Sequence, residues 1–239
     1  MTPPHVELFN PILARGIRPL LKQAGFAKSG AFFRRYRGEL VDCLQFQRDG
    51  NAVPDLYVTV NCGVYVIGSG EVWADFRAGE KPHVFTSSVH DRIGDICDEA
   101  YDRWWRLPST ASDAQSAEVS DDITGRLRDT VLPWMERFRS AKDVGDYLVD
   151  PARRPGEYHR GKPVYPTRRG VDDMCEAAVC YLIAGRLDLA HRWLGLAIAT
   201  QDPRYPGARS LKARIEQLVA MGRFPRRPGA APGPVDGAN

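Results

Sequence analysis

The sequence predicts an α+β protein: an antiparallel sheet with flanking helices, followed by a small all-helical C-terminal part. Between residues 31 and 67, apolar side chains recur at every second position, which is typical of half-buried strands. Before and after this region the apolar spacing becomes helical. The 239 residues are 43% hydrophobic and 26% charged. This composition supports a sizeable core and excludes collagen, a disordered chain and a disulfide mini-protein.

The N-terminal segment predicts a helix. Asn10 suits an N-cap and Pro11 suits the first helical position, so we expect the helix to begin there. Gly25 suits the left-handed residue that ends a helix. Pro19 predicts a bend or a division, because an interior proline costs about 3 kcal/mol. The expected buried face consists of Phe9, Ile12, Leu13, Leu20 and Leu21.

Three strands follow in the predicted sheet. Ala31–Arg37 and Leu40–Arg48 form a hairpin that turns at Gly38, and Leu56–Ile67 has the most regular alternation. In Leu56–Ile67 every even position is apolar, so the odd positions face the opposite side of the sheet. The polar side chains on that opposite face are Tyr57, Thr59, Asn61 and Tyr65.

The region from 71 to 150 has weaker patterns. Glu71–Phe76 and His83–Val89 read as further strands, and residues 89–104 have apolar side chains at helical spacing. Residues 119–138 form an amphipathic helical pattern, and Ser140 is a candidate N-cap for one more short helix. We therefore expect one α+β domain over residues 5–150.

The C-terminal part predicts a linker and a helical hairpin. Residues 151–170 are basic and rich in proline and glycine, which favours an extended linker. Small and aromatic residues then recur at helical spacing around a glycine turn: Ala177, Ala178, Tyr181, Gly185, Ala190 and Trp193. This pattern resembles one tetratricopeptide (TPR-like) hairpin, and we expect this hairpin and one further helix, at about 207–221, to make up residues 171–221. A peptide-binding solenoid needs about three repeats, so we do not expect one. We expect residues 222–239 to be disordered.

Several short blocks carry a family resemblance over roughly residues 8–150. They are Gly25–Lys28, Phe32–Arg34, Leu44–Gln47, Thr59–Val64, Asp91–Gly94 and Asp102–Trp105. Together they resemble the uncharacterised bacterial family known as domain of unknown function 4304. Where that family often has Gln-Lys-Ser, this chain has Gln47-Arg48-Asp49. The resemblance implies an α+β domain from a bacterium and implies no activity.

The two halves of the chain differ in charge, and the cysteine content indicates the compartment. Residues 1–150 hold 18 basic and 22 acidic side chains, whereas residues 151–239 hold 15 basic and 8 acidic side chains. The five cysteines form no CxxC pair, so we expect free thiols in a reducing compartment. The N-terminus has no signal-peptide pattern, and the uncharged stretch Leu56–Gly70 is too short to span a bilayer. We expect a cytoplasmic protein without a membrane partner.

Searches for catalytic motifs give no match, and we expect no cofactor and no metal. Phosphate-binding, zinc-protease and serine-hydrolase patterns are absent from the sequence. Asp55 lacks the Glu-x-Lys that a metal nuclease would need, and His83 and His90 lack a third ligand at typical spacing. An enzyme with a dispersed His/Asp site remains as a third hypothesis.

Our preferred hypothesis is a non-catalytic protein-binding module, acting as an adaptor or immunity-type partner. A sheet face of amides, hydroxyls and aromatic rings can recognise a protein, although the same face could be solvated or covered by a helix. The candidate partner-binding residues are Gln45, Gln47, Tyr57, Thr59, Asn61, Tyr65, Arg92 and Trp105. For Arg92, a structural ion pair with an acidic neighbour is the competing explanation.

The alternative hypothesis is nucleic-acid binding through the basic linker and the C-terminal half. Basic side chains interleaved with aromatic rings can contact phosphates and stack on bases. The candidate residues are Arg153, Arg154, Arg160, Lys162, Arg168 and Arg169. Binding of this kind would weaken steeply as the salt concentration rises.

Overall fold

The computed structural model describes residues 4–49, 55–73, 81–97, 99, 102–150, 158–159, 162–163, 166–200 and 207–224. The chain divides into two compact units. The first unit consists of residues 1–64 and 83–137, and the second consists of residues 65–82 and 138–239.

A six-stranded antiparallel sheet organises the first unit, which confirms the predicted fold class. Its order is β1-β2-β3-β4-β5, and β6 also pairs with β4. The bounds are Ala27–Ser29 for β1, Phe32–Arg37 for β2, Leu40–Arg48 for β3, Leu56–Val66 for β4, Val89–Arg92 for β5 and Trp105–Leu107 for β6. The three strands that alternation predicted are therefore present, within one residue at each end.

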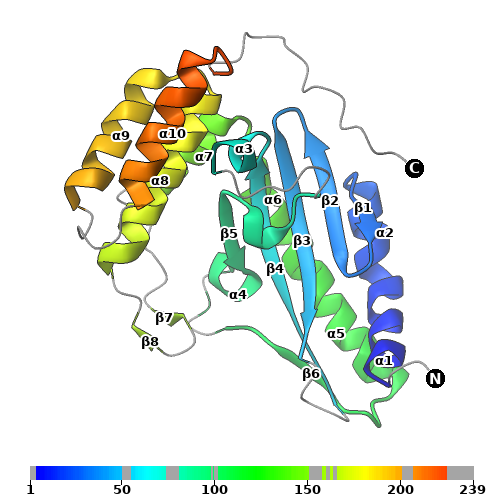
Figure 1. Ribbon diagram of the computed structural model, residues 1–239. Coiled ribbons are helices and arrows are strands. Elements are labelled where there is room, and N and C mark those ends of the chain that lie inside the picture. The colour runs from blue at the N-terminus through cyan, green and yellow to red at the C-terminus, as the bar shows by residue number, and fades with distance from the viewer. Residues whose placement is uncertain are drawn as a thin grey trace. The chain divides into compact units, whose positions relative to one another are not determined.

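Two groups of helices cover one face of this sheet (Figure 1). The first group is α1 (Pro4–Ile12), the π-helical turn Leu13–Ile17 and α2 (Arg18–Gln23). The second is α5 (Asp113–Arg126), the π-helical turn Leu127–Val131 and α6 (Leu132–Glu136). Phe46 from β3 packs against Phe9 and Phe33, with ring centroids 6.0 and 5.5 Å away. This cluster joins the helices to the sheet.

The first helix corrects one prediction and confirms another. Helix α1 begins at Pro4 rather than at Asn10, because Phe9 and Ile12 on either side of that position are already buried in the core. Gly25 has the expected positive φ, at 85°. A π-helical turn ends just before the segment that contains Pro19, which fits the expected division of the helix. The wider hydrogen-bond spacing of a π turn accommodates a proline that has no N–H to donate.

The predictions between 71 and 107 are largely wrong. The chain forms helix α3 (Ser69–Trp73) where a strand was expected, and residues 74–76 lie outside the described part. Instead of a strand over 83–89 and a helix over 89–104, the chain has a 3₁₀ turn (Val84–Thr86), β5, and one helical turn, α4 (Ile93–Ile96). Pairing of β5 with β4 overrides the helical spacing. Val89 and Ile93 are both buried, one on the strand and the other on the turn that follows it.

The second unit is mainly helical. Its elements are α3, α7 (Ala141–Leu148), the strand pair β7 (Tyr158–His159) and β8 (Lys162–Pro163), α8 (Pro166–Ile183), α9 (Leu187–Thr200) and α10 (Gly207–Ala220). Ser140 caps α7 as expected, by accepting a hydrogen bond from the Asp143 amide. Gly185 turns the chain between α8 and α9 with φ 74°. In Figure 1, α8, α9 and α10 lie side by side.

Side-chain hydrogen bonds fasten the smaller helices of this unit. The Trp73 indole on α3 donates to Glu176 on α8 at 2.6 Å, and the Tyr181 hydroxyl donates to Asp146 on α7 at 2.8 Å. Burial and the Asp146 carboxylate both raise the pKa of Tyr181. No helix in the described part of the chain is long and apolar enough to cross a membrane. Most of the predicted linker and most of the predicted tail lie outside the described residues.

Candidate functional site

The face of the sheet opposite the helices holds most of the predicted partner-binding residues. The register places Phe32 of β2 opposite Gln45 of β3, and Asn61 of β4 opposite Arg92 of β5. The exposed part of this face is smaller than the sequence suggested. Thr59 is fully buried, and five per cent or less of Asn61, Tyr65 and Trp105 is exposed, while 8% of Arg92 is exposed. Gln45, Gln47 and Tyr57 are half-buried and reach the surface.

Three carboxamide side chains on this face, Gln45, Gln47 and Asn61, form what we call the amide cluster. The Asn61 Nδ2 group donates to Gln47 Oε1 at 3.0 Å and to Gln45 Oε1 at 3.4 Å. Because each Gln side-chain oxygen is oriented toward Asn61, each Gln Nε2 group is directed elsewhere. Within the described residues, neither Nε2 group has a hydrogen-bond partner. The cluster therefore offers fixed, available N–H donors.

Aromatic side chains flank the amide cluster. Phe32 lies beside Gln45 in the register, and the Arg34 guanidinium stacks over the Phe32 ring at 5.2 Å. Farther along the same face of β2, Tyr36 is 59% exposed. Tyr36 is not among the candidate residues predicted from the sequence. Its signal was available, because Tyr36 has the same strand parity as Phe32 in the predicted strand 31–37.

Arg92 and Trp105 are used in internal contacts. Arg92 pairs with Asp102 at 3.0 Å, and its guanidinium stacks on the Trp104 ring at 5.2 Å. The Trp105 indole donates to Asp122 on α5 at 2.7 Å. Burial would raise the pKa of Asp122, but hydrogen bonds to its carboxylate, from the Trp105 indole among others, lower it overall. These contacts hold the chain around 92–107 in place.

Two other predicted residues, Thr59 and Tyr65, have their hydroxyl groups inside the protein. The Thr59 hydroxyl is buried and has no hydrogen-bond partner in the described part of the chain. The Tyr65 hydroxyl, which belongs to the second unit, accepts from the Gly70 amide at 3.4 Å. Of the eight predicted residues, Gln45, Gln47 and Tyr57 are thus the ones that a partner reaches without rearrangement.

The chemistry needed for a metal site is not assembled in the described ranges. No group of three or more His, Cys, Asp or Glu side chains there is placed to hold a metal ion. Asp55 instead forms an ion pair with Arg106 at 2.7 Å, and hydrogen bonds from Arg106 and the Ser109 amide lower the pKa of Asp55. Burial raises the pKa of the Cys43 thiol to about 12, which suits a core thiol.

The predicted nucleic-acid residues lie in a part of the chain whose side chains the structure does not describe. Arg153, Arg154 and Arg160 are outside the described residues altogether. For Lys162, Arg168 and Arg169 the backbone alone is described, in β8 and at the start of α8. The described residues therefore do not test this alternative.

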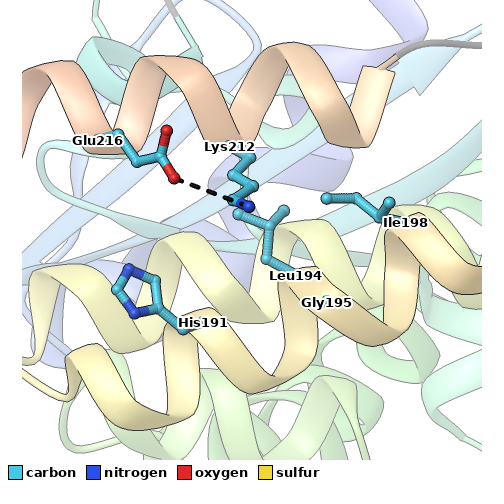
Figure 2. A pocket seen from close by; sticks show the side chains of 6 residues that line it. All are labelled: His191, Leu194, Gly195, Ile198, Lys212 and Glu216. Atoms are coloured by element: carbon cyan, nitrogen blue, oxygen red, sulfur yellow. Dashed lines mark ion pairs between the residues drawn. The ribbon is translucent and has the colours of Figure 1, made fainter.

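A hollow of about 390 Å³ lies between α9 and α10 in the second unit (Figure 2). Leu194, Gly195 and Ile198 of α9 line one side, and Lys212 and Glu216 of α10 line the other. No candidate residue predicted from the sequence lines this hollow. The sequence feature that could have indicated the hollow is Gly195, a glycine in the middle of helix α9.

Comparisons with known proteins give one family. The model of a family described as "Domain of unknown function (DUF4304)" matches residues 17–137, which is half of the chain. The match covers the sheet from β1 to β6 and the helices α2, α5 and α6. Curated proteins and solved structures give no match.

Proposed function

We propose that this chain, which belongs to the family described as Domain of unknown function (DUF4304), is a non-catalytic protein-binding module. It acts as an adaptor or immunity-type partner in the bacterial cytoplasm. The partner contacts the amide cluster together with Phe32 and Tyr57. The helices α8 and α9 are the TPR-like hairpin of the same protein.

The available donors of the amide cluster carry this proposal. Each Gln Nε2 group bears two N–H bonds, and backbone carbonyls and carboxylates of a protein segment are suitable acceptors. Asn61 fixes both Gln side chains before binding, which reduces the side-chain entropy lost on association. Aromatic rings and Arg34 beside the amides match the composition that protein interfaces favour.

A double substitution tests the role of these donors. In Gln45→Glu/Gln47→Glu each side chain keeps the acceptor oxygen for Asn61 and loses its N–H donors. Gln115→Glu is the matched control, because Gln115 also uses Oε1 to accept a hydrogen bond, in the cap of α5, and glutamate serves equally well there. The three proteins serve as baits for affinity capture from a native lysate, with and without nuclease and at two salt concentrations.

The proposal expects one stoichiometric protein that both wild type and Gln115→Glu retain after nuclease treatment and at high salt. Gln45→Glu/Gln47→Glu should lose at least nine-tenths of it. A partner captured equally by all three baits would rule out the amide cluster as the binding site. Capture that disappears with nuclease or at modest salt would instead favour nucleic-acid binding through the basic segment.

A further inference from the structure

The amide cluster presents its hydrogen-bond donors at a fixed repeat along β3. Gln45 and Gln47 lie two residues apart, so both side chains leave the same face of the sheet. Phe46 between them packs against Phe9 on the helix side. The Cα atoms of the two glutamines are about 6.6 Å apart, because a strand rises about 3.3 Å per residue. Asn61 holds both Oε1 atoms and, within the described part of the chain, leaves both Nε2 groups available.

The backbone of an extended peptide has the same repeat. Successive carbonyl groups of a strand point to opposite sides, so the carbonyl groups on one side recur at every second residue, about 6.6 Å apart. Two such carbonyl groups match the two Gln amides in number, in spacing and in hydrogen-bond polarity. A helix offers no comparable row, because its interior carbonyl groups accept hydrogen bonds within the helix.

The electrostatic character of the cluster favours a neutral acceptor over a carboxylate. Its three carboxamides are uncharged and present only the positive ends of their N–H bonds. Arg92, the cation opposite Asn61 in the register, already pairs with Asp102 at 3.0 Å, and 10% of its side chain is exposed. A carboxylate in this place would lose hydration and meet neutral amides, whereas a backbone carbonyl group carries only a partial charge and is satisfied by an N–H donor.

Neighbouring side chains limit the length of the open face. Ser87 covers the sheet at Gly63, where an added Cβ would lie 2.6 Å from Ser87 Oγ. Phe32 of β2 lies opposite Gln45 in the register, and the half-buried Tyr57 belongs to β4 on the other side of β3. When one carbonyl row of an extended segment faces the glutamines, its side chains point sideways, toward these two rings. The open face therefore suits a short segment.

We propose that the amide cluster binds a short extended segment of the partner protein through the backbone of that segment. Gln45 Nε2 donates to one carbonyl group of the segment, and Gln47 Nε2 donates to the carbonyl group two residues away. The side chains of the segment contact Phe32 and Tyr57. This inference rests on the proposed function and adds the conformation and the chemical groups that the partner presents.

The probe is a phage-displayed library of random twelve-residue peptides, selected on the full-length wild-type protein and on Gln45→Glu/Gln47→Glu in parallel. We expect enrichment on wild type alone, and the best peptide should bind the Gln115→Glu control as it binds wild type. This peptide is then synthesised with one thioamide at each successive position, which weakens one carbonyl acceptor and keeps its N–H group. Thermal unfolding checks that each variant is folded.

The thioamide series should show a two-residue alternation. Binding to wild type should weaken about twofold to tenfold at each of two positions that lie two residues apart, since each loses one hydrogen bond. The thioamide between them is the internal control, because its carbonyl group points away from the glutamines. On the single variant Gln45→Glu, one of the two thioamides should have no further effect, whereas the other should still weaken binding.

Three outcomes would overturn the inference. One is equal enrichment on wild type and on Gln45→Glu/Gln47→Glu, or no enrichment on either. Another is a peptide that needs both glutamines but shows no two-residue alternation; the proposed function would then stand without the extended backbone. The third is a wild-type dimer in sedimentation velocity that Gln45→Glu/Gln47→Glu abolishes, because the occupant would then be a second copy of the chain. Failure of the proposed function is seen separately, as equal lysate capture by wild type, Gln115→Glu and the double variant.

Discussion

The substitution Asp42→Asn should destabilise the first unit strongly. Asp42 on β3 is fully buried. Its Oδ2 accepts hydrogen bonds from Arg35 Nε and Arg37 Nε, both at 2.7 Å, and its Oδ1 accepts one from Arg37 Nη2 at 2.7 Å. Asparagine keeps the size of the side chain but removes its negative charge and replaces one acceptor with an NH₂ donor.

The magnitude follows from the partners that remain. Removing one member of a buried ion pair costs about 3–5 kcal/mol. In the variant, Arg35 retains its ion pair with Glu136 at 2.7 Å, and Arg37 Nη2 retains its hydrogen bond to the Met135 carbonyl at 3.1 Å. We therefore expect a loss at the lower end of this range, about 3 kcal/mol. With a urea m value of about 2 kcal/mol per molar, the unfolding midpoint should fall by about 1.5 M.

Urea unfolding is followed by circular dichroism, and the control is Asp129→Asn. Asp129 also pairs with an arginine, Arg128 at 2.7 Å, but 63% of its side chain is exposed. The control should therefore lose about 0–1 kcal/mol. If Asp42→Asn and Asp129→Asn shift the midpoint equally, the buried charge cluster does not stabilise the fold as described. Hydrogen exchange at β2 and β3 would then be expected to stay unchanged as well.

Four further predictions concern single positions. Gly63→Ala should destabilise by about 1–3 kcal/mol in urea unfolding, because the added Cβ would lie 2.8 Å from Ser87 Cβ; an unchanged midpoint would contradict this packing. Gly195→Ala should instead stabilise by about 1 kcal/mol in the same assay, and a loss of stability would show that the hollow is filled by the chain itself. In the native protein Cys97, which is partly buried, should react with a thiol reagent well before the other four cysteines, which are buried. Burial raises the pKa of Cys43 from 9.0 to about 12, so the free energy of unfolding should fall as pH rises from about 9 toward 12; a flat profile would contradict the buried thiol.

The sequence predicted the sheet best where its pattern was local. In β3 and β4 the apolar positions alternate over nine and eleven residues, and the strands follow those positions. The pattern failed at 71–107, where long-range contacts decide the structure. Trp73 makes its hydrogen bond to Glu176, more than a hundred residues away, so no local spacing could indicate that α3 is a helix.

The candidate site was predicted in part for a similar reason. Strand parity correctly placed Gln45, Gln47 and Asn61 on one face. The ion pair of Arg92 with Asp102 is the competing explanation that the sequence offered for Arg92. Strand parity could not indicate that Trp105 would bond to Asp122, since Asp122 lies on a helix outside the strand pattern. The hollow between α9 and α10 depends on the spacing of two helices, which periodicity does not encode.

The proposed function requires that the side-chain amides of Gln45 and Gln47 contact the partner directly. The most direct measurement is a ¹⁵N–¹H spectrum of protein labelled at glutamine side chains, titrated with the captured partner. We expect the NH₂ signals of Gln45 and Gln47 to shift and saturate with binding, while those of Gln115 and Gln217 stay in place. Saturated binding with unshifted Gln45 and Gln47 signals would contradict it.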